Sequence, residues 1–172
     1  MLDPPARDVK IGQMGLMVRL VPLSGRHASD LAMLAADDWD VCGFVAHAQR
    51  LRARRERQTF AVLDADRLVG LGMLGRDPSM PAHAELGYWI GPRERGLGYA
   101  TAAARQLLTH AFGRMAIALV FAHCPDDNPA SARVLAKLGF RLVGVSHETP
   151  GASDTLNRYE LTSREWGDAR VP

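Results

Sequence analysis

A glycine-containing loop, RERGLGYA over residues 93–100, lies between a run of strand formers and an alanine-rich run typical of a helix. Gly96 and Gly98 carry no Cβ, so their backbone can approach an anion closely. The start of a helix adds unpaired amide N–H groups and a partial positive charge. The loop therefore suits a diphosphate, to which Arg93 and Arg95 can add charge pairing. The glycines alone are equally typical of a tight turn flanked by solvated arginines.

Two common phosphate-binding motifs are excluded by the residues of the loop and of the helix after it. In the dinucleotide fingerprint G-x-G-x-x-G, the third glycine would fall on Thr101. A Walker loop is excluded because no Gly-Lys-Ser/Thr sequence follows the first glycine. The loop must therefore be interpreted together with its neighbours.

Four strands and two helices are predicted before the loop. Apolar and β-branched runs bounded by turn residues mark the strands, and apolar residues at helical spacing mark the helices. Residues 64–66 predict the turn of a hairpin. Residues 1–16 show no period and predict a loose lead-in. The predicted strands are Met17–Pro22, Thr59–Leu63, Leu68–Leu74 and His83–Ile90, and the predicted helices are His27–Ala36 and Phe44–Arg57.

Two helices and three strands are predicted from the loop onward. Asn128 suits the N-cap of the second of these helices, Pro129 its first position and Gly139 its C-terminal cap. The order of elements indicates an α/β (α+β) domain with one dominant sheet. The predicted helices are residues 98–112 and 128–138, and the predicted strands are Ala116–His123, Phe140–Ser146 and Asn157–Leu161.

The composition fits one globular domain over residues 1–172. The chain is 47% hydrophobic and 23% charged, with a formal net charge of +2, which gives no strong preference for a polyanion. Its cysteines, Cys42 and Cys124, are too few for a disulfide scaffold or a cysteine zinc site. The histidines show no metal-ligand spacing, so no metal is expected. Without a membrane-length apolar run or a signal-peptide core, the expected location is the cytoplasm, with no membrane partner.

Residues 50–57 contain a run of arginines that is most simply a solvated helix face. The alternative is attraction for an acidic acceptor or for the phosphates of a nucleotide. Nucleic-acid binding would require a larger basic excess and interleaved aromatic residues, which are absent. No nucleic-acid partner is therefore expected.

In its context, the loop resembles the acetyl-CoA signature of the GNAT superfamily of N-acetyltransferases. Arg93, Gly96 and Gly98 match the pattern R/Q-x-x-G-x-G/A. The segments AELGYWIGP over residues 84–92 and NPASARVLAKLGF over residues 128–140 are similar to segments of the RimJ/RimL branch, which acetylates protein N-termini. Shorter similarities at each end extend the resemblance to about residues 17–166.

The resemblance implies a mostly antiparallel, twisted sheet that splays between its fourth and fifth strands and is flanked by about four helices. Here those strands are His83–Ile90 and Ala116–His123. The resemblance places the pantetheine arm of acetyl-CoA in the splay and the pyrophosphate on the amides of residues 95–100. The implied cofactor-binding residues are Tyr88, Ile90, Arg93, Arg95, Gly96, Leu97, Gly98, Tyr99, Ala100, Asn128 and Ser131.

The implied reaction is direct transfer of an acetyl group from acetyl-CoA to a primary amine, through a tetrahedral intermediate. It requires a base, because an alkyl amine with a pKa of about 10 is mostly protonated at neutral pH. Glu85 is the favoured base, because its flanking residues are apolar and the RimJ/RimL branch often has a glutamate here. Strand alternation places it with Gly87 and Trp89 on one face. The alternative is a solvated strand charge. A backbone amide at the splay, such as that of Ile90, would stabilise the oxyanion.

Ser131 and Asn128 are the remaining candidates for chemistry. Asn128 is a helix cap in any case, and the resemblance adds contact with the cofactor arm or a bound water. Ser131 is a proposed general acid in RimL-like enzymes, or a small packing residue. Leu135 stands where many GNAT enzymes have a tyrosine acid, so Ser131 or water would protonate the thiolate. Ala102 replaces a glutamate frequent in this branch and is expected outside the chemistry.

The acceptor is open at this stage: a protein N-terminus, an amino acid, a polyamine or an antibiotic. The resemblance places its groove at about residues 37–47 and 148–157, with Trp39, Phe44 and Trp89 as lining or as ordinary core. A non-catalytic acyl-CoA-binding module and an interaction protein using the arginine-rich helix are the alternative functions. The family includes both monomers and homodimers.

Overall fold

The computed structural model describes residues 9–11, 16–35, 40–146 and 156–168. Within them an eight-stranded sheet has the order β1-β2-β3-β4-β5-β6-β8-β7. The β5–β6 pair is parallel, and the other neighbours are antiparallel. The strands are β1 Val9–Ile11, β2 Leu16–Pro22, β3 Arg57–Asp64, β4 Arg67–Arg76, β5 His83–Ile90, β6 Leu119–Pro125, β7 Arg141–Ser146 and β8 Leu156–Thr162.

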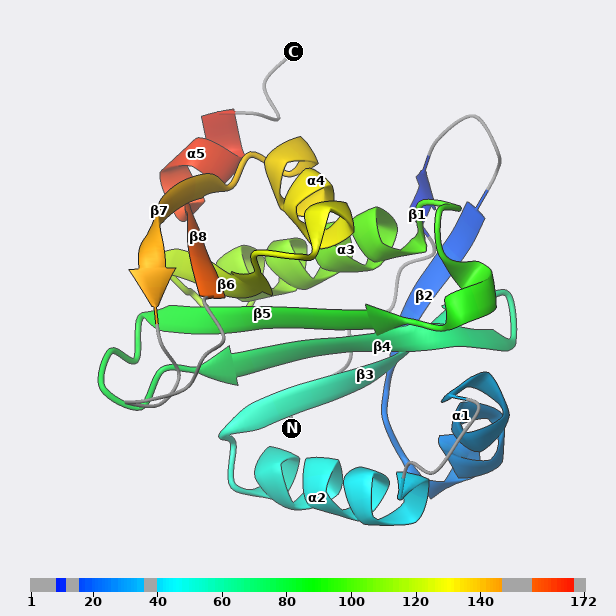
Figure 1. Ribbon diagram of the computed structural model, residues 1–172. Coiled ribbons are helices and arrows are strands. Elements are labelled where there is room, and N and C mark those ends of the chain that lie inside the picture. Colours follow the sequence, from blue (N-terminus) through cyan, green and yellow to red (C-terminus); the bar gives the residue numbers. More distant parts are fainter. Residues whose placement is uncertain (1–8, 12–15, 36–39, 147–155, 169–172) are drawn as a thin grey trace.

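Helices cover both faces of the sheet (Figure 1). On one side, α1 and α2 lie beneath β3–β5, and on the other α3 crosses the sheet. The helices are α1 Ala28–Ala35, α2 Val41–Ala53, α3 Tyr99–Gly113, α4 Pro129–Lys137 and α5 Ser163–Asp168, with short 3-10 helices η1 Gly25–His27 and η2 Pro92–Glu94.

The hydrophobic core is divided between the two faces. The α3 side contains Leu86 and Ile90 of β5 with Leu107 and Leu108 of α3. The α1–α2 side contains Leu31, Val45 and Leu71, against which Trp89 packs. The predicted alternation along β5 is therefore confirmed, since Trp89 and Ile90 lie in different clusters.

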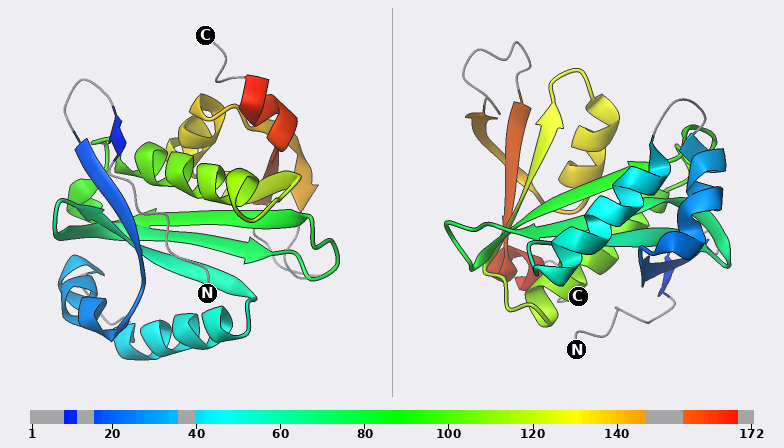
Figure 2. Two further views of the ribbon diagram at one scale, coloured as in Figure 1. Left: turned by 180° about the vertical axis from the view of Figure 1, so that it is seen from behind. Right: turned by 90° about the horizontal axis from the view of Figure 1, so that it is seen from below.

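The sheet opens between β5 and β6. Their pairing is confined to His83 with Leu119, Ala84 with Val120 and Glu85 with Phe121. Beyond these pairs β5 continues to Ile90 and β6 to Pro125. Figure 2 (right) shows β6 and β8 turning away from β3–β5, with α4 on the open side. The splay predicted between the fourth and fifth strands is confirmed, and these strands become β5 and β6 because β1 precedes them.

Several predicted boundaries are wrong. The helix predicted at residues 44–57 is α2, Val41–Ala53. It starts earlier because the Asp40 carboxylate accepts the N–H of Gly43 at 2.9 Å, which caps the helix. It ends earlier because Arg55 has a φ of 62°, and Arg57 already belongs to β3. β6 starts at Leu119 rather than residue 116, where φ is 52°.

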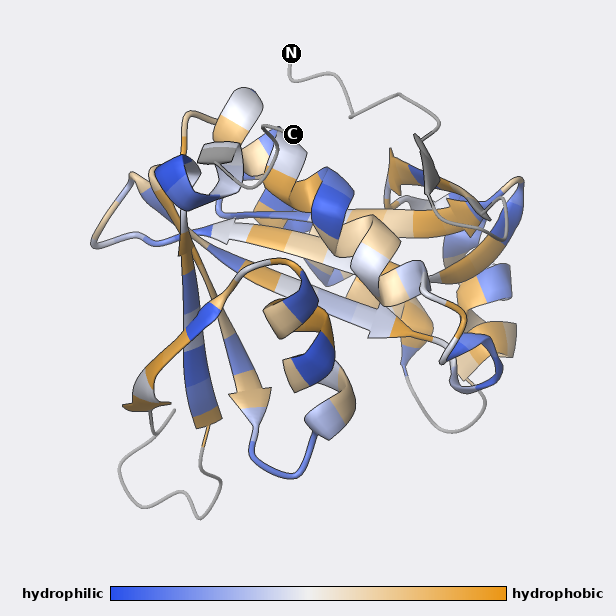
Figure 3. Ribbon diagram, turned by 90° about the horizontal axis from the view of Figure 1, so that it is seen from above, coloured by the Kyte–Doolittle hydropathy of each residue, from blue (hydrophilic) through white to orange (hydrophobic). Residues whose placement is uncertain are grey.

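One strand and one α-helix are absent from the prediction. β1 lies within the segment predicted as a loose lead-in and pairs with β2. The short helix α5 follows β8. At the opposite edge of the sheet, β7 exposes Leu142, Val143 and Val145. Figure 3 shows apolar colour on part of this edge strand. No helix among the described residues is long and apolar enough to span a membrane.

Candidate active site

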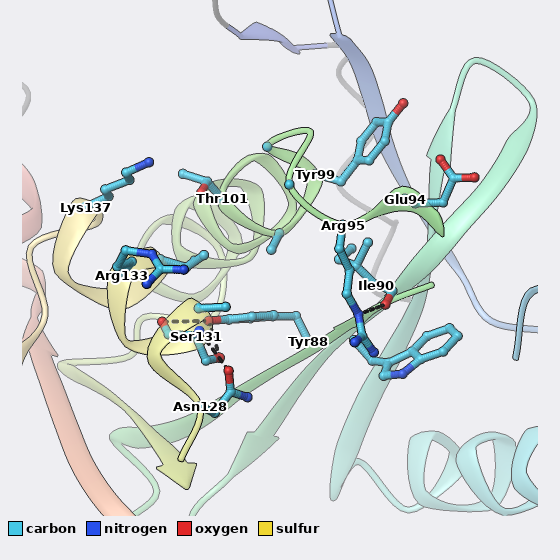
Figure 4. A pocket seen from close by; sticks show the side chains of 16 residues that line it. Tyr88, Ile90, Glu94, Arg95, Tyr99, Thr101, Asn128, Ser131, Arg133 and Lys137 are labelled. Atoms are coloured by element: carbon cyan, nitrogen blue, oxygen red, sulfur yellow. Dashed lines mark hydrogen bonds between the residues drawn. The ribbon is translucent and has the colours of Figure 1, made fainter. Parts of the chain in front are cut away.

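A cavity of about 500 Å³ lies where β5 and β6 diverge, between the start of α3 and the helix α4 (Figure 4). Residues from β5, from the glycine loop and from α4 form its wall. The lining residues are Tyr88, Trp89, Ile90, Glu94, Arg95, Gly96, Gly98, Tyr99, Ala100, Thr101, Asn128, Ala130, Ser131, Arg133, Val134 and Lys137. Of the predicted cofactor-binding residues, all but Arg93 and Leu97 line this cavity.

The glycine loop has a backbone that other residues adopt only with strain. Gly96 and Gly98 have φ values of 79° and 92°, in the left-handed region. Gly98 is the N-cap of α3 and offers no side chain to the helix amides. The first hydrogen bond that closes on it runs from the Ala102 N–H to the Gly98 carbonyl at 3.0 Å. The first turn of α3 therefore presents free amide donors at the cavity.

Cations from α4 face this helix start across the cavity (Figure 4). Arg133 and Lys137 are exposed, line the cavity and form no ion pair among the described residues. Neither was predicted, although their i, i+4 spacing in a helix opposite the loop was a usable signal. Arg95 was predicted to face the diphosphate, and its Nε donates to the Ile90 carbonyl at 3.2 Å. Free amides and unpaired cations together suit a polyanionic ligand such as the diphosphate of CoA.

The loop is fastened to the β3–β4 hairpin. Arg67 forms an ion pair with Glu94, and the Tyr99 hydroxyl donates to Asp64. Burial raises the pKa of Tyr99, so its hydroxyl stays a donor. The Tyr99 side chain is therefore an anchor, and only its backbone is available to a ligand. Arg93 and Leu97 are exposed and lie outside the cavity lining.

A pair of hydroxyl groups stands at the inner wall of the cavity. The Tyr88 Oη lies 2.8 Å from the Ser131 Oγ and donates to the Ser131 carbonyl at 3.3 Å. Burial raises the pKa of Tyr88 to about 12, which keeps its proton in place at neutral pH. Asn128 caps α4 by accepting the Ser131 N–H at 3.1 Å. The cap and the tyrosine thus hold Ser131 from two directions.

Glu85 lies outside this cavity and lines a neighbouring pocket of about 360 Å³. Its Oε2 accepts from Arg57 Nη2 at 2.9 Å, and its Oε1 lies 3.2 Å from His123 Nδ1. Sequence reasoning missed both partners, because Arg57 was placed in a helix and His123 was considered only as a metal ligand. The lining residues are Arg57, Met73, Glu85, Leu86, Gly87, His123, Pro125 and Leu156.

The pocket and the cavity border consecutive stretches of β5. Glu85, Leu86 and Gly87 line the pocket, and Tyr88, Trp89 and Ile90 line the cavity. Because side chains alternate along a strand, Glu85 and Tyr88 point to opposite faces of β5. A ligand arm in the cavity and an acceptor in the pocket would meet in the opening between β5 and β6.

Other residues discussed in the sequence analysis are buried packing residues. Cys124 is 1% exposed, and burial raises the pKa of its thiol, as expected of a packing residue. Ala102 and Leu135 are buried in the α3-side core. Among the described residues, no group of three or more histidine, cysteine or acidic side chains could hold a metal ion.

The segments predicted to form the acceptor groove are described only in part. Trp39 lies outside the described residues, as do 36–38 and 147–155. Phe44 and Trp89 pack against the α1–α2 core, and Trp89 also borders the cavity. Most of the arginine-rich run is exposed at the end of α2, as a solvated face would be.

Residues 18–141 match the acetyltransferase (GNAT) domain family. YdaF of Bacillus subtilis (strain 168) is 35% identical over 102 residues, which are 58% of this chain and 56% of that protein. The ribosomal-protein-serine acetyltransferase of Escherichia coli (strain K12) is 26% identical over 114 residues, or 66% of this chain and 64% of that protein. The chain thus spans about three fifths of the length of these curated relatives.

A solved structure extends the similarity to most of the fold. Mycobacterium smegmatis RimJ in complex with CoA-disulfide matches with a TM-score of 0.75 and 22% identity, over 88% of this chain and 88% of that chain. The resemblance to the RimJ/RimL branch is supported by these relatives. With the family match covering residues 18–141, the chain belongs to the GNAT acetyltransferase domain family.

Proposed function

We propose that this domain is an acetyl-CoA-dependent N-acetyltransferase that moves an acetyl group to a primary amine. The observation that carries the proposal is the cavity at the splay, where the uncapped start of α3 faces Arg133 and Lys137. Family membership supports the reaction class, and this arrangement supports a site for the CoA diphosphate here. When bound, acetyl-CoA supplies a thioester whose acyl carbon is open to attack by an amine.

The chain's contribution to binding begins at the loop. The amides from Arg95 to Ala100 hold the pyrophosphate, with Arg133 and Lys137 as counter-charges. The free edge of β5 near Tyr88 and Ile90 lies along the pantetheine arm. Neither Arg93 nor Leu97 lines the cavity, and no side-chain role is proposed for either.

The two neighbouring stretches of β5 divide the proton transfers. Glu85, alone or together with His123 beside it, takes a proton from the amine in the neighbouring pocket. The backbone amide of Ile90 is the proposed oxyanion donor. On the cavity side the Ser131 hydroxyl, held by Tyr88, gives a proton to the departing thiolate and takes one back from solvent. Of the two protons that the ammonium loses, one replaces that proton through solvent and the other is released.

The acceptor class is proposed from the relatives. One curated relative is named a ribosomal-protein-serine acetyltransferase, which together with the resemblance to the RimJ/RimL branch supports a protein N-terminus as the first candidate. A small free amine is the second. Both carry the primary amine that the chemistry requires.

The test is calorimetric titration with CoA and acetyl-CoA, followed by an assay of thiol release. The acceptors would be peptides beginning with serine or alanine, and spermidine. We expect CoA binding, and release of thiol with one acceptor class. Absence of CoA binding would contradict the proposal.

A non-catalytic acyl-CoA-binding module is the alternative outcome. It would bind CoA through the same loop and release no thiol with any amine. Glu85→Gln separates the two functions, since it lowers turnover of an enzyme while leaving CoA affinity intact. The matched control is Glu160→Gln on β8, a carboxylate paired with Arg158 that lines neither the cavity nor the pocket.

A further inference from the structure

Glu85 does not stand alone in its pocket, because both of its oxygens are engaged. Arg57 donates to Oε2 at 2.9 Å, and His123 lies 3.2 Å from Oε1 through Nδ1. Arg57 can reach across β4 because Gly75 has no side chain; a Cβ there would lie 3.2 Å from the Arg57 Nε. The carboxylate is thus fixed from one side and turned toward an imidazole on the other.

His123 has one ring nitrogen without a partner. Its Nε2 is buried and makes no hydrogen bond among the described residues. A carboxylate accepts hydrogen bonds, so Glu85 favours a proton on Nδ1 and leaves the lone pair on Nε2. His123 lines the pocket, and a buried ring nitrogen without a partner is a site for a hydrogen-bond donor that comes within reach.

We propose that His123 is a second catalytic residue: Nε2 takes the proton of the acceptor amine, directly or through a water, and Glu85 holds the imidazole in the tautomer that this requires. This inference rests on the proposed acetyl transfer. The N–H bond of the ammonium breaks and its electron pair stays on nitrogen. The proton bonds to Nε2, and the resulting imidazolium is stabilised by the Glu85 carboxylate. The freed nitrogen pair then attacks the thioester carbon, and the imidazolium later loses its proton to solvent.

Other charged groups border the imidazole. From β8, Arg158 lies opposite His123 in the strand register and over the Phe121 ring at 4.1 Å. Arg158 is paired with Glu160 at 2.9 Å, and Arg57 is paired with Glu85. Both arginines thus have a carboxylate partner, and Glu85 is the carboxylate in contact with the imidazole.

A pair of substitutions separates catalysis from positioning. His123→Asn keeps a donor near the place of Nδ1 and removes Nε2, whereas His123→Gln keeps an amide near Nε2 and removes the Nδ1 donor. If Nε2 takes the proton, both variants lose turnover, by about 100-fold for a general base, and keep their CoA affinity. Turnover near that of wild type in His123→Asn would overturn the proposal.

The kinetic probe is acetyl-CoA with a peptide that begins with serine. We expect the acid limb of the wild-type pH–rate profile to disappear in His123→Asn. His83→Asn is the matched control, since His83 lies on β5 and also has a buried, unpartnered ring nitrogen but borders neither the cavity nor the pocket. It should leave turnover unchanged.

A measurement without turnover keeps the inference separate from the proposed function. In protein labelled with ¹⁵N-histidine, NMR should find neutral His123 protonated on Nδ1. Glu85→Gln retains an acceptor oxygen and should keep this tautomer, whereas Glu85→Ala should lose it. A proton on Nε2 of neutral His123 in wild type would overturn the proposal that Glu85 sets the tautomer of His123. If wild type showed the Nδ1 tautomer but transferred no acetyl group to any amine, the proposed function would fail, and the catalytic role of His123 with it.

Discussion

Gly96 and Gly98 occupy backbone positions that make the cavity possible. Both lie in the left-handed region, where a residue with a Cβ is strained by about 1–2 kcal/mol. A Cβ at Gly96 would meet nothing within 4 Å. A substitution there therefore combines a backbone cost with whatever the new side chain does to a ligand.

Gly96→Asp is expected to lower CoA affinity by roughly tenfold or more relative to Gly96→Ala, a difference of about 1.4 kcal/mol. Both variants place a Cβ in the left-handed region, where aspartate is less strained than alanine, and the aspartate alone repels the diphosphate. Calorimetric titration measures the difference. Gly113→Asp, at the far end of α3 and also in open space, is the control. Equal affinities of the two Gly96 variants would contradict the diphosphate site.

Tyr88 makes a contribution that depends on pH. Burial raises its pKa to about 12, above the ordinary value of about 10. Between these values the unfolded chain has lost the proton that the folded chain keeps, so the free energy of unfolding falls as pH rises. Tyr88→Phe lacks this group and should lose less stability between pH 9 and 11. The difference is at most roughly 1.4 kcal/mol at pH 11 before solvent screening.

Urea unfolding of wild type and Tyr88→Phe at both pH values measures this difference. The same variant should retain CoA affinity and turn over more slowly, because Ser131 loses its hydroxyl partner. Parallel pH dependence in the two proteins would show that the Tyr88 hydroxyl is not buried as described.

At the scale of elements, α4 depends on a cap that also positions a candidate acid. Asn128→Ala should lower the free energy of unfolding by about 1 kcal/mol and slow turnover, because the Ser131 amide loses its acceptor. Asn128→Asp keeps an acceptor oxygen and should restore stability. Chemical denaturation and thiol release measure the two effects. Equal stability of Asn128→Ala and wild type would exclude the cap.

Elements with local signals were predictable from the sequence. β5 was predicted with its observed bounds, and α4 with its cap, because Asn128, Pro129 and Gly139 act on their own neighbours. The ends of α2 were not predicted correctly, since they depend on the Asp40 cap and on the left-handed backbone of Arg55. β1 and α5 are short, and their position depends on pairing with β2 and on packing after β8. Short elements of this kind carry little periodic signal.

The candidate site was predictable where it follows one segment of chain. The loop and Ser131 were found because their motifs are continuous. His123 and Arg57 were not, since they reach Glu85 only through the register of β5 with β6 and of β3 with β4. Arg133 and Lys137 become part of the cavity only because α4 lies across from α3. Contacts of this kind, between residues far apart in the sequence, depend on tertiary structure.

At the scale of the whole molecule, few pairs of residues join the two halves of the sheet. β5 and β6 share only the pairs from His83 to Glu85, and the cavity beyond them is lined from β5, α3 and α4. A ligand there contacts both halves and stabilises only the folded state. CoA at about 100 times its Kd should add about 2.7 kcal/mol to the free energy of unfolding.

That stabilisation corresponds to a rise of roughly 5–10 °C in Tm for a chain of this size. Differential scanning calorimetry measures it, and Gly96→Asp at the same CoA concentration is the control. An unchanged wild-type Tm would mean that CoA does not occupy the cavity.

The contacts of Arg67 with Glu94 and of Tyr99 with Asp64 hold the glycine loop before any ligand arrives. Its conformational entropy is therefore lost when the chain folds and not when CoA binds. Association should then show a heat-capacity change that matches the apolar area covered by the ligand, without the additional part that accompanies coupled folding. In thermodynamic terms, we expect CoA binding to the glycine loop to resemble rigid-body association.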